Sequence, residues 1–417
     1  MADKRVVITG LGVLSPIGNS ASQAWENAIA GKSGITRLSL VDPELFSSQI
    51  AGEVKDFDPV ELLGAKETRR NDRYTQLAIV AARQAWADSG LSEASIDPER
   101  VGVVIGSGVG GLGTYEEQHT IALERGPGRI SSLFVPMMIS NMAAGQVAIE
   151  INAKGPNFAT VTACASSTHA IASSVDAIRL GRAEVMVAGG SEAPLTLMSI
   201  GGFCSMKALC TSFNDEPEKA SRPFDRDRSG FVIAEGACIL ILEELEHAKA
   251  RGANIIAEVC GVGMSCDAHH ITAPAPGGEG CARAMVMAMN DAGMNAEDVD
   301  YINAHGTSTQ LNDINETEAI KTALGKHAAE VMVSSTKSVH GHMLGATGGM
   351  EIMLTALALK NGIVPPTSTH MIPGEGCDLD YVPGTARKAD IQCALSNSLG
   401  FGGHNACIAL RKYKGDS

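Results

Sequence analysis

Short, uninterrupted apolar runs recur along the chain, and helical patterns separate them. Strands of this kind are expected at residues 5–9, 101–105, 184–189, 255–263, 299–304, 331–335, 391–396 and 405–411. Runs without polar alternation are typical of strands that are buried on both faces, which requires helices on each side of the sheet. The chain is therefore predicted to be an α/β protein with a large buried core.

This alternation of strands and helices runs through the chain twice. The first pass covers residues 1–254, the second covers residues 255–412, and a short tail at 413–417 follows. Two α/β halves placed side by side fit this order better than one doubly wound sheet, and a duplication would explain them. We therefore expect an N-terminal half and a C-terminal half of similar architecture.

Composition narrows the function classes. The formal net charge is −14, which disfavours nucleic-acid binding because that requires a basic surface. Ten cysteines include no CxxC pair and no Cys/His spacing of a zinc site, so free thiols in a reducing compartment are expected. No signal peptide and no apolar run of membrane-spanning length is found, which predicts a cytoplasmic protein without a membrane partner.

Glycine-rich turns give no sign of a nucleotide cofactor. Gly10, Gly12 and Gly18 do not form a GxGxxG fingerprint, so a nicotinamide site is rejected. The run at 106–111 could cradle a phosphate, but no Lys-Ser/Thr follows it as a P-loop requires. Close packing of backbones is the better interpretation of the run at 106–111.

One cysteine, Cys164, stands between a run with strand character (157–163) and a helical pattern rich in small residues. Backbone N–H groups and the helix dipole favour an anion at such a place, so its thiol is expected to have a lowered pKa and to act as a nucleophile. A buried cysteine that serves as a small apolar residue explains this stretch equally well when it is taken alone.

Two histidines lie in small-residue loops after predicted strands. His305 follows strand 299–304, and His342 lies in the loop after strand 331–335. Sites gather at the carboxyl ends of parallel strands, so both are candidates to meet Cys164. A Cys/His hydrolase needs one base and an orienting Asn or Asp, whereas two neutral imidazoles can stabilise an enolate oxygen. The set indicates acyl transfer with carbon–carbon bond formation.

Four motifs in this order resemble those of the β-ketoacyl-acyl-carrier-protein synthases, and the type II elongating enzymes in particular. The motifs are Thr162-Ala163-Cys164-Ala165-Ser166-Ser167, Asn303-Ala304-His305-Gly306-Thr307-Ser308-Thr309, Ser335-Thr336-Lys337-Ser338 with Gly341-His342, and Asn397-Ser398-Leu399-Gly400-Phe401-Gly402-Gly403. The resemblance extends from Val6 to about Leu410 without a large gap. It implies a thiolase-like fold, in which two βα halves form a five-layered αβαβα core, and usually a homodimer.

The resemblance also implies catalytic roles. Cys164 would accept an acyl chain from acyl carrier protein, and malonyl carrier protein would then lose carbon dioxide and attack the acyl-cysteine. His305 and His342 match the two histidines that assist decarboxylation. Lys337 matches the family lysine, with Glu351 as its structural partner. Phe401 matches the residue that gates the acyl pocket, and its N–H, with that of Cys164, matches the oxyanion hole.

Further residues match substrate contacts. Thr307 and Thr309 match the residues that bind the pantetheine arm, Thr272 and Asp267 lie on a loop that resembles a second gate, and Val109 and Phe134 would line the acyl pocket. A locally basic segment, with one more lysine downstream, matches the dock for the acidic carrier protein: Lys66, Arg69, Arg70 and Lys207. No cofactor is required, although four residues resemble a monovalent-cation site of some relatives: Asn303, Glu351, Ser396 and Asn397.

Three positions depart from the family pattern. Leu399 stands where many relatives have Phe, His404 where many have Thr, and His340 where a small or polar residue is common. Among the alternatives, a non-catalytic chain-length partner would lack Cys164, a thiolase would have a second cysteine in place of His342, and a Cys/His hydrolase would have an orienting Asn. A ketosynthase of a type II polyketide pathway has nearly the same motifs and stays open.

Overall fold

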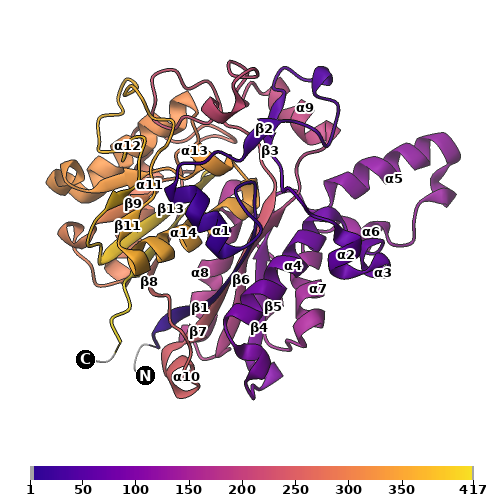
Figure 1. The fold of residues 1–417 in the computed structure, drawn as a ribbon, viewed down its shortest axis with the longest axis horizontal. Helices are drawn as coiled ribbons and strands as arrows, with labels where there is room; N and C mark the ends of the chain where they lie inside the picture. The colour runs from indigo at the N-terminus through magenta and orange to yellow at the C-terminus, as the bar shows by residue number, and fades with distance from the viewer. Residues whose placement is uncertain (1–3, 416–417) are drawn as a thin grey trace.

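The computed structural model describes residues 4–415, and ten strands form its main sheet (Figure 1). Their order across the sheet is β10-β9-β13-β14-β8-β1-β7-β6-β4-β5. The bounds are β1 Val6–Leu14, β4 Val101–Gly106, β5 Asn157–Phe158, β6 Val185–Glu192, β7 Gly236–Glu244, β8 Ala257–Cys266, β9 Tyr301–Asn303, β10 Met332–Ser334, β13 Cys393–Gly400 and β14 His404–Arg411. Two small sheets pair β2 (Ile35–Arg37) with β3 (Ile50–Gly52) and β11 (Ile363–Val364) with β12 (Arg387–Lys388).

The two halves of the main sheet have the same strand order. In each half the first strand in sequence, β1 or β8, lies at the inner edge, and the last strand, β7 or β14, lies next to it. These inner strands pair antiparallel where Val6–Ile8 meet Ala257–Val259, so the halves join into one continuous sheet. The repeated order supports the prediction of two similar halves. The exact boundaries at 254 and 412 stay a prediction, and residues 416–417 of the tail lie outside the described part.

Helices form three layers around the strands. Outside the first half lie α4 (Arg73–Asp88) and α7 (Met142–Ile151), and outside the second half lie α11 (Glu279–Asp291) and α12 (Gln310–Leu324). Between the halves lie α8 (Ser166–Arg179) and α14 (Thr347–Asn361), which contact strands of both halves. The predicted α/β class and its five-layered thiolase-like arrangement are thereby confirmed.

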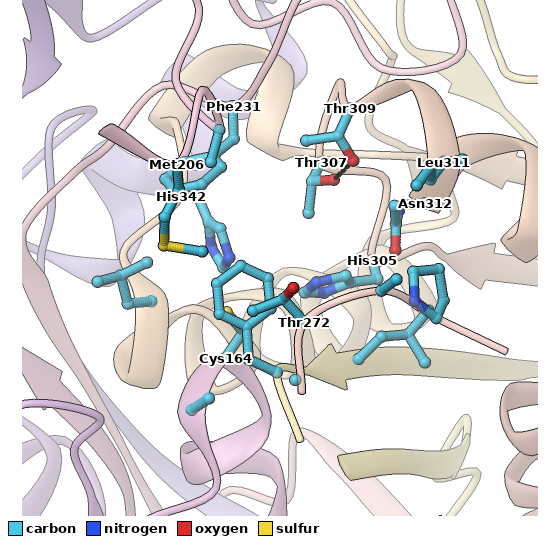
Figure 2. Close-up of a pocket in the computed structure, with 18 of the residues that line it drawn as sticks. Cys164, Met206, Phe231, Thr272, His305, Thr307, Thr309, Leu311, Asn312 and His342 are labelled. Carbon is cyan, nitrogen blue, oxygen red and sulfur yellow. Dashed lines mark hydrogen bonds between the residues drawn. The ribbon is translucent and has the colours of Figure 1, made fainter. Parts of the chain in front are cut away.

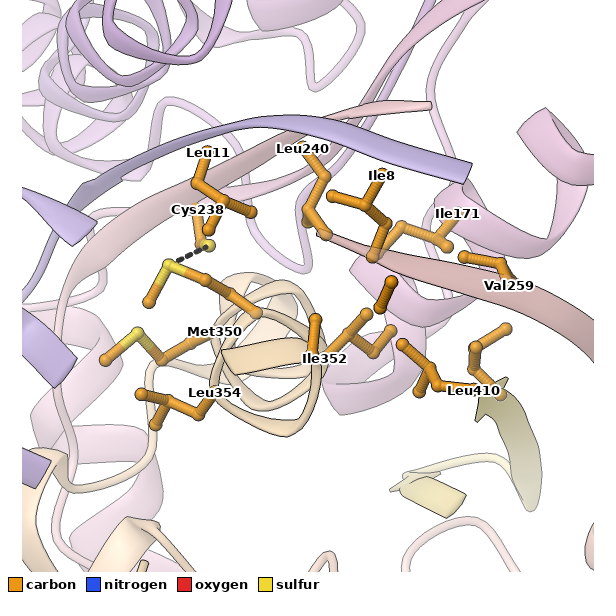
Figure 3. Packing of buried hydrophobic residues seen from close by; sticks show 14 of the residues in the cluster. Ile8, Leu11, Ile171, Cys238, Leu240, Val259, Met350, Ile352, Leu354 and Leu410 are labelled. Carbon is orange, nitrogen blue, oxygen red and sulfur yellow. Dashed lines mark hydrogen bonds between the residues drawn. The ribbon is translucent and has the colours of Figure 1, made fainter. Parts of the chain in front are cut away.

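The middle layer forms the largest hydrophobic core. Figure 3 shows residues of α14, among them Met350 and Ile352, packed between β1 and β7 on one side and β14 on the other. Nearly every residue of α14 is buried, because both of its neighbours are sheets. Burial on all sides fixes this helix firmly, and its first turn lies beside the cavity described below.

Glycines let each half bring its first strand against its outer helix. A Cβ on Gly12 would lie 1.9 Å from the carbonyl oxygen of Ala81 in α4, and a Cβ on Gly263 would lie 1.9 Å from that of Ala284 in α11. Gly12 of β1 and Gly263 of β8 therefore serve close backbone packing. The contact is the same in the two halves.

Two predicted elements are wrong in extent. The strand expected at 157–163 is limited to β5, because Ser166 draws the next residues into a turn: its hydroxyl accepts from the N–H of Thr162 at 2.9 Å. The apolar pattern of residues 135–152 predicts one continuous helix, but these residues form two, α6 (Phe134–Met138) and α7. The carbonyl of Met138 accepts instead from the N–H of Gly111, and that of Ile139 accepts from the hydroxyl of Tyr74.

The remaining helices complete the surface. They are α1 Ala21–Ile29, α2 Pro59–Leu63, α3 Ala65–Thr68, α5 Leu112–Arg125, α9 Leu197–Ser205, α10 Leu245–Ala250 and α13 Lys337–His340. Helix α5, which the sequence pattern did not predict, projects from the body of the protein (Figure 1). Within residues 4–415, no helix is long and apolar enough to cross a membrane.

Candidate active site

A cavity of about 520 Å³ opens between the two halves, and both halves line it. Cys164, His305 and His342 all face this cavity (Figure 2). The imidazole rings of His305 and His342 are nearly perpendicular, with centroids 5.4 Å apart. The structure thus brings together the thiol and the two histidines that sequence analysis selected from three separate loops.

The nucleophile turn holds Cys164 at the start of α8. Cys164 lies in a 3-10 turn at Ala163–Ala165 that leads directly into this helix, and Ala163 has a φ of 51°. The hydroxyl of Ser166 donates to the carbonyl of Ala163 at 2.7 Å, which stabilises the strained turn. A Cβ on Gly400 would lie 2.5 Å from the carbonyl oxygen of Thr162, so glycine allows the Phe401 loop to approach.

The charge state of Cys164 differs from the expectation. Burial raises the pKa of its thiol to about 12, although Lys337 and the N–H groups of Phe401 and Cys164 itself favour the thiolate. The predicted lowering of the pKa is therefore wrong for this structure, because loss of water outweighs the helix end. At neutral pH the thiol is protonated, and it must give up its proton as it attacks.

The two histidines are neutral at physiological pH. Burial lowers the pKa of His305 and of His342 well below the usual range, and the positive charge of Lys337 lowers both further. Lys337 Nζ lies 3.4 Å from His305 Nδ1 and donates to the carbonyl oxygen of His305 at 2.5 Å. An ammonium group can only donate, so His305 Nδ1 accepts and the ring proton resides on Nε2.

A similar arrangement holds His342. Its Nδ1 lies 3.0 Å from the hydroxyl of Thr347, the first residue of α14, which can donate to it and leave the ring proton on Nε2. Two neutral imidazoles that present N–H groups to one cavity can stabilise an oxyanion without carrying a charge themselves.

Lys337 and Glu351 form a fully buried ion pair behind His305. Burial raises the pKa of Glu351, and the ammonium of Lys337 opposes that shift. Four buried oxygens in this part of the structure have no hydrogen-bond partner within the described residues, and they belong to the predicted cation site: Asn303 Oδ1, Glu351 Oε2, Ser396 Oγ and Asn397 Oδ1.

Two buried carboxylates that support the site were not found from the sequence. Glu316 in α12 accepts the N–H groups of His305 and Gly306, each at 2.7 Å, and so fixes the loop that carries His305. Glu192 at the end of β6 accepts hydrogen bonds from the backbone N–H groups of Gly108 and Val109, which follow β4. An acidic residue inside a helical pattern or at a strand end usually faces solvent, so the sequence carried no signal for either.

The predicted substrate residues lie mainly around the cavity. Val109, Asp267, Thr272, Thr307 and Thr309 line it, and the hydroxyls of the last two are 2.9 Å apart. Phe134 is placed differently, because it begins α6 with its ring 6.3 Å from that of Tyr115 and does not line this cavity in the single chain.

Two loops at the cavity are bound to each other. The N–H of Gly402 donates to the carbonyl of Ile271 at 2.8 Å, and that of Asp267 donates to the carbonyl of Gly403 at 2.9 Å. The loop that carries Phe401 and the loop that carries Thr272 therefore share hydrogen bonds, and one cannot move far without the other.

The predicted dock is exposed. Lys66, Arg69 and Arg70 lie on or directly after α3, and Lys207 reaches the cavity itself. Their side chains make no ion pair within residues 4–415, so their charges are available to a partner.

The three departures from the family pattern have different surroundings. Leu399 lines the cavity, and the ring of His404 lies edge-on to that of His169 with centroids 6.4 Å apart. His340 is buried, where it contacts the hydroxyl of Thr336 and the carbonyl of Gly341. Burial and Lys337 lower the pKa of His340 to about 3, so it is neutral and adds little charge near His342.

Comparisons with known proteins show the family of the chain. Residues 3–248 match the family model "Beta-ketoacyl synthase, N-terminal domain", and residues 256–370 match "Beta-ketoacyl synthase, C-terminal domain". The 3-oxoacyl-[acyl-carrier-protein] synthase 2 of Staphylococcus aureus (strain COL) is 52% identical over 99% of both chains, and that of Synechocystis sp. is 50% identical over the same shares.

Solved structures of ketosynthases have the same fold as this chain. A type II polyketide ketosynthase, solved in complex with its acyl-carrier protein, is 36% identical, with a TM-score of 0.91 over 99% of this chain and 100% of that one. A β-ketoacyl synthase from Burkholderia phymatum is 34% identical, with a TM-score of 0.91 over the same shares.

Proposed function

This chain belongs to the β-ketoacyl synthase family, and we propose that it is a 3-oxoacyl-[acyl-carrier-protein] synthase that elongates fatty acids by two carbons. The observation that carries the proposal is the meeting of Cys164, His305 and His342 in one cavity. The identity of 52% over nearly the full length with enzymes of that name supports the same reaction and substrate class.

The first half-reaction loads the enzyme. The sulfur of Cys164 attacks the thioester carbonyl of an acyl carrier protein, and the carrier thiol leaves with the proton that the cysteine gives up. The N–H groups of Cys164 and Phe401 face the developing oxyanion. Because the thiol is protonated at neutral pH, the proton has to leave as the sulfur attacks, and it ends on the carrier thiol that departs.

The second half-reaction forms the carbon–carbon bond. A malonyl carrier protein loses carbon dioxide, and the N–H groups of His305 and His342 stabilise the enolate oxygen of the resulting thioester. The enolate carbon attacks the acyl-cysteine carbonyl, and the sulfur of Cys164 leaves as the 3-oxoacyl product forms. Neutral histidines suit this step, because an imidazolium would hold the malonyl carboxylate as an ion pair and oppose its loss.

Fatty-acid elongation is favoured over the alternatives. A type II polyketide ketosynthase shares the fold, but the identity with the one compared is 36%, against 52% for the fatty-acid enzymes. A non-catalytic chain-length partner is disfavoured because Cys164 is present and lies in the cavity. A thiolase is disfavoured because His342 stands where a second cysteine would act.

A substitution at the nucleophile tests the reaction directly. Cys164→Gln removes the acyl acceptor and retains the histidines, so we expect condensation to fall by roughly a thousandfold or more and malonyl decarboxylation to persist or rise. Condensation is measured with malonyl carrier protein and acyl primers, and decarboxylation by carbon dioxide release. His342→Ala is the matched comparison, in which decarboxylation is also lost. Condensation by the glutamine variant would contradict the proposal.

We also propose that the basic surface at α3, with Lys207, docks the acidic carrier protein. Support comes from its exposed, unpaired cations on a chain of net charge −14. Lys207 stands at the cavity, so a carrier bound there could deliver its arm past Thr307 and Thr309. Charge complementarity of this kind mainly speeds encounter and weakens with salt.

Charge reversal tests the dock. Lys66→Glu with Arg70→Glu is expected to raise the KM for malonyl carrier protein roughly tenfold at low salt, and the difference shrinks as salt rises. The rate with a malonyl N-acetylcysteamine thioester, which lacks the carrier, should not change. Lys326→Glu, an exposed lysine after α12, is the control. An equal loss with both substrates would mean that the variant damages the site and not the dock.

We further propose that Asn303, Glu351, Ser396 and Asn397 bind a monovalent cation. Their four unpartnered buried oxygens, one of them a carboxylate, form the donor set that potassium or sodium prefers. When bound, the ion would supply positive charge that holds this region in place. It takes no part in the steps above.

The thermal stability of the protein in different monovalent cations tests this site. Replacing choline with potassium or sodium at constant ionic strength should raise the Tm of the wild type by roughly 1–3 °C. Ser396→Ala should abolish the increase, whereas Ser368→Ala, which removes another unpartnered hydroxyl, should preserve it. Equal Tm values of the wild type in choline, sodium and potassium would refute the site.

We propose that the chain forms a homodimer through β5. This strand pairs with β4 alone and presents a free edge, which proteins usually cover. Exposed apolar side chains lie in or near this part of the chain: Leu123, Val135, Ile149, Phe158 and Val161. Sedimentation should give a dimer for the wild type and for Leu180→Asp, and a monomer for Phe158→Asp. A monomeric wild type would contradict the proposal.

The ten free cysteines support a reducing compartment as the place of action. We propose the cytoplasm as that compartment.

A further inference from the structure

The carboxylate of Glu192 is fully buried and accepts four hydrogen bonds. The hydroxyl of Ser107 and the N–H of Val109 donate to Oε1 at 2.7 and 3.1 Å. The N–H groups of Gly108 and Gly345 donate to Oε2 at 2.6 and 2.9 Å. Three of the four donors are backbone N–H groups, so the carboxylate fixes the position of the main chain at Gly108, Val109 and Gly345.

These contacts join segments from the two halves of the protein. Ser107 to Val109 follow β4 in the first half, and Gly345 follows His342 in the second half. Val109, which donates to the carboxylate, and Leu344, which precedes Gly345, line the same cavity as Cys164. Glu192 therefore ties the wall formed by Val109 to the segment that carries His342.

Glycines make this close approach possible. A Cβ on Gly108 would lie 2.8 Å from Glu192 Oε2, and a Cβ on Gly345 would lie 2.6 Å from the same atom. Any other residue at either position would push the carboxylate away. The tether thus depends on three residues at once, a glutamate and two glycines.

We propose that Glu192 is a positioning residue that sets the acyl wall of the cavity relative to Cys164 and His342, and thereby the discrimination among acyl chain lengths. The inference rests on the proposed function for its substrate class. A pocket distinguishes chains that differ by one methylene by roughly tenfold or more only if its wall is held rigidly. A wall held by three backbone hydrogen bonds meets that condition.

The charge of Glu192 also acts on the nucleophile. Its carboxylate raises the pKa of the Cys164 thiol, and the ammonium of Lys337 opposes it. The other titratable groups that face Cys164 are His305 and His342, which are neutral at physiological pH. Removal of the carboxylate charge should therefore favour the thiolate, an effect that a purely structural role would not produce.

Glu192→Gln separates these contributions from simple loss of packing. Glutamine offers one acceptor oxygen and one NH₂ group, and the donors approach both positions of the carboxylate. Either orientation leaves at least one backbone N–H facing an NH₂ group. The segment of Gly108 and Val109 or that of Gly345 must then shift.

Two measurements check the variant. The ratio of kcat/KM between the best primer and a primer two carbons longer should fall by roughly fivefold. The rate of Cys164 alkylation by iodoacetamide at pH 7.5 should rise by roughly threefold or more, because the thiolate fraction increases. Ser107→Ala removes one hydrogen-bond donor and preserves the charge of Glu192. It should lower the ratio of kcat/KM between the two primers less than Glu192→Gln does, and it should leave the rate of Cys164 alkylation unchanged.

Glu243→Gln is the matched control. Glu243 is a fully buried carboxylate of β7 that binds Thr9 and Arg251 and does not line the cavity. We expect it to lower Tm without changing the primer ratio or alkylation. The inference is overturned if Glu192→Gln also lowers Tm without changing the primer ratio or the alkylation rate. If Glu192→Gln fails to fold, the inference is overturned when Ser107→Ala keeps the wild-type primer ratio.

The proposed function fails in a different way. If the wild type elongates no acyl primer, the proposed function is wrong, and the primer ratio has no meaning. Alkylation of Cys164 needs no substrate and still reports whether Glu192 sets the state of the thiol. An unchanged alkylation rate in Glu192→Gln would then overturn the inference as well.

Discussion

The site depends on the two helices that are enclosed between the halves of the sheet. Both α8 and α14 begin beside the cavity, α8 directly after Cys164 and α14 at Thr347, which contacts His342. Burial between two sheets fixes their axes, and their first turns fix the thiol and one imidazole. His305 is then positioned from the second half alone, by Glu316 in α12 and by Lys337. The reacting groups are thus held by core packing more than by surface loops.

Burial also decides the charge of the site. It maintains Cys164 as a thiol and both histidines as neutral imidazoles, so these three side chains present N–H groups and one sulfur in place of ions. The positive charge of Lys337 lies behind His305, paired with Glu351. Such a site favours loss of a carboxylate as carbon dioxide, because the two imidazoles beside Cys164 carry no positive charge to hold the substrate anion.

Much of the fold and of the site could be predicted from the sequence. Apolar runs located most strands, because strands buried on both faces have a clear composition, and the four motifs led to the family. The pKa of Cys164 could not be predicted, because a helix end is visible in the sequence whereas the depth of burial is not. Glu192 and Glu316 were missed for the same reason: nothing in the sequence shows that a carboxylate is buried against backbone N–H groups. The break between α6 and α7 was missed because Tyr74 competes for its carbonyl from another helix.

The matching contacts of Gly12 with Ala81 and of Gly263 with Ala284 have a consequence for how the two halves can evolve. At Gly12 and Gly263 the fold depends on the absence of a Cβ atom. A methyl group there would push the outer helix away from the strand, and a substitution elsewhere in the chain would not bring the two backbones together again. The rest of each half is free to diverge in sequence. Sequence similarity between the two halves should therefore be retained longest at these glycines during evolution. An alignment of one half with the other can begin from them.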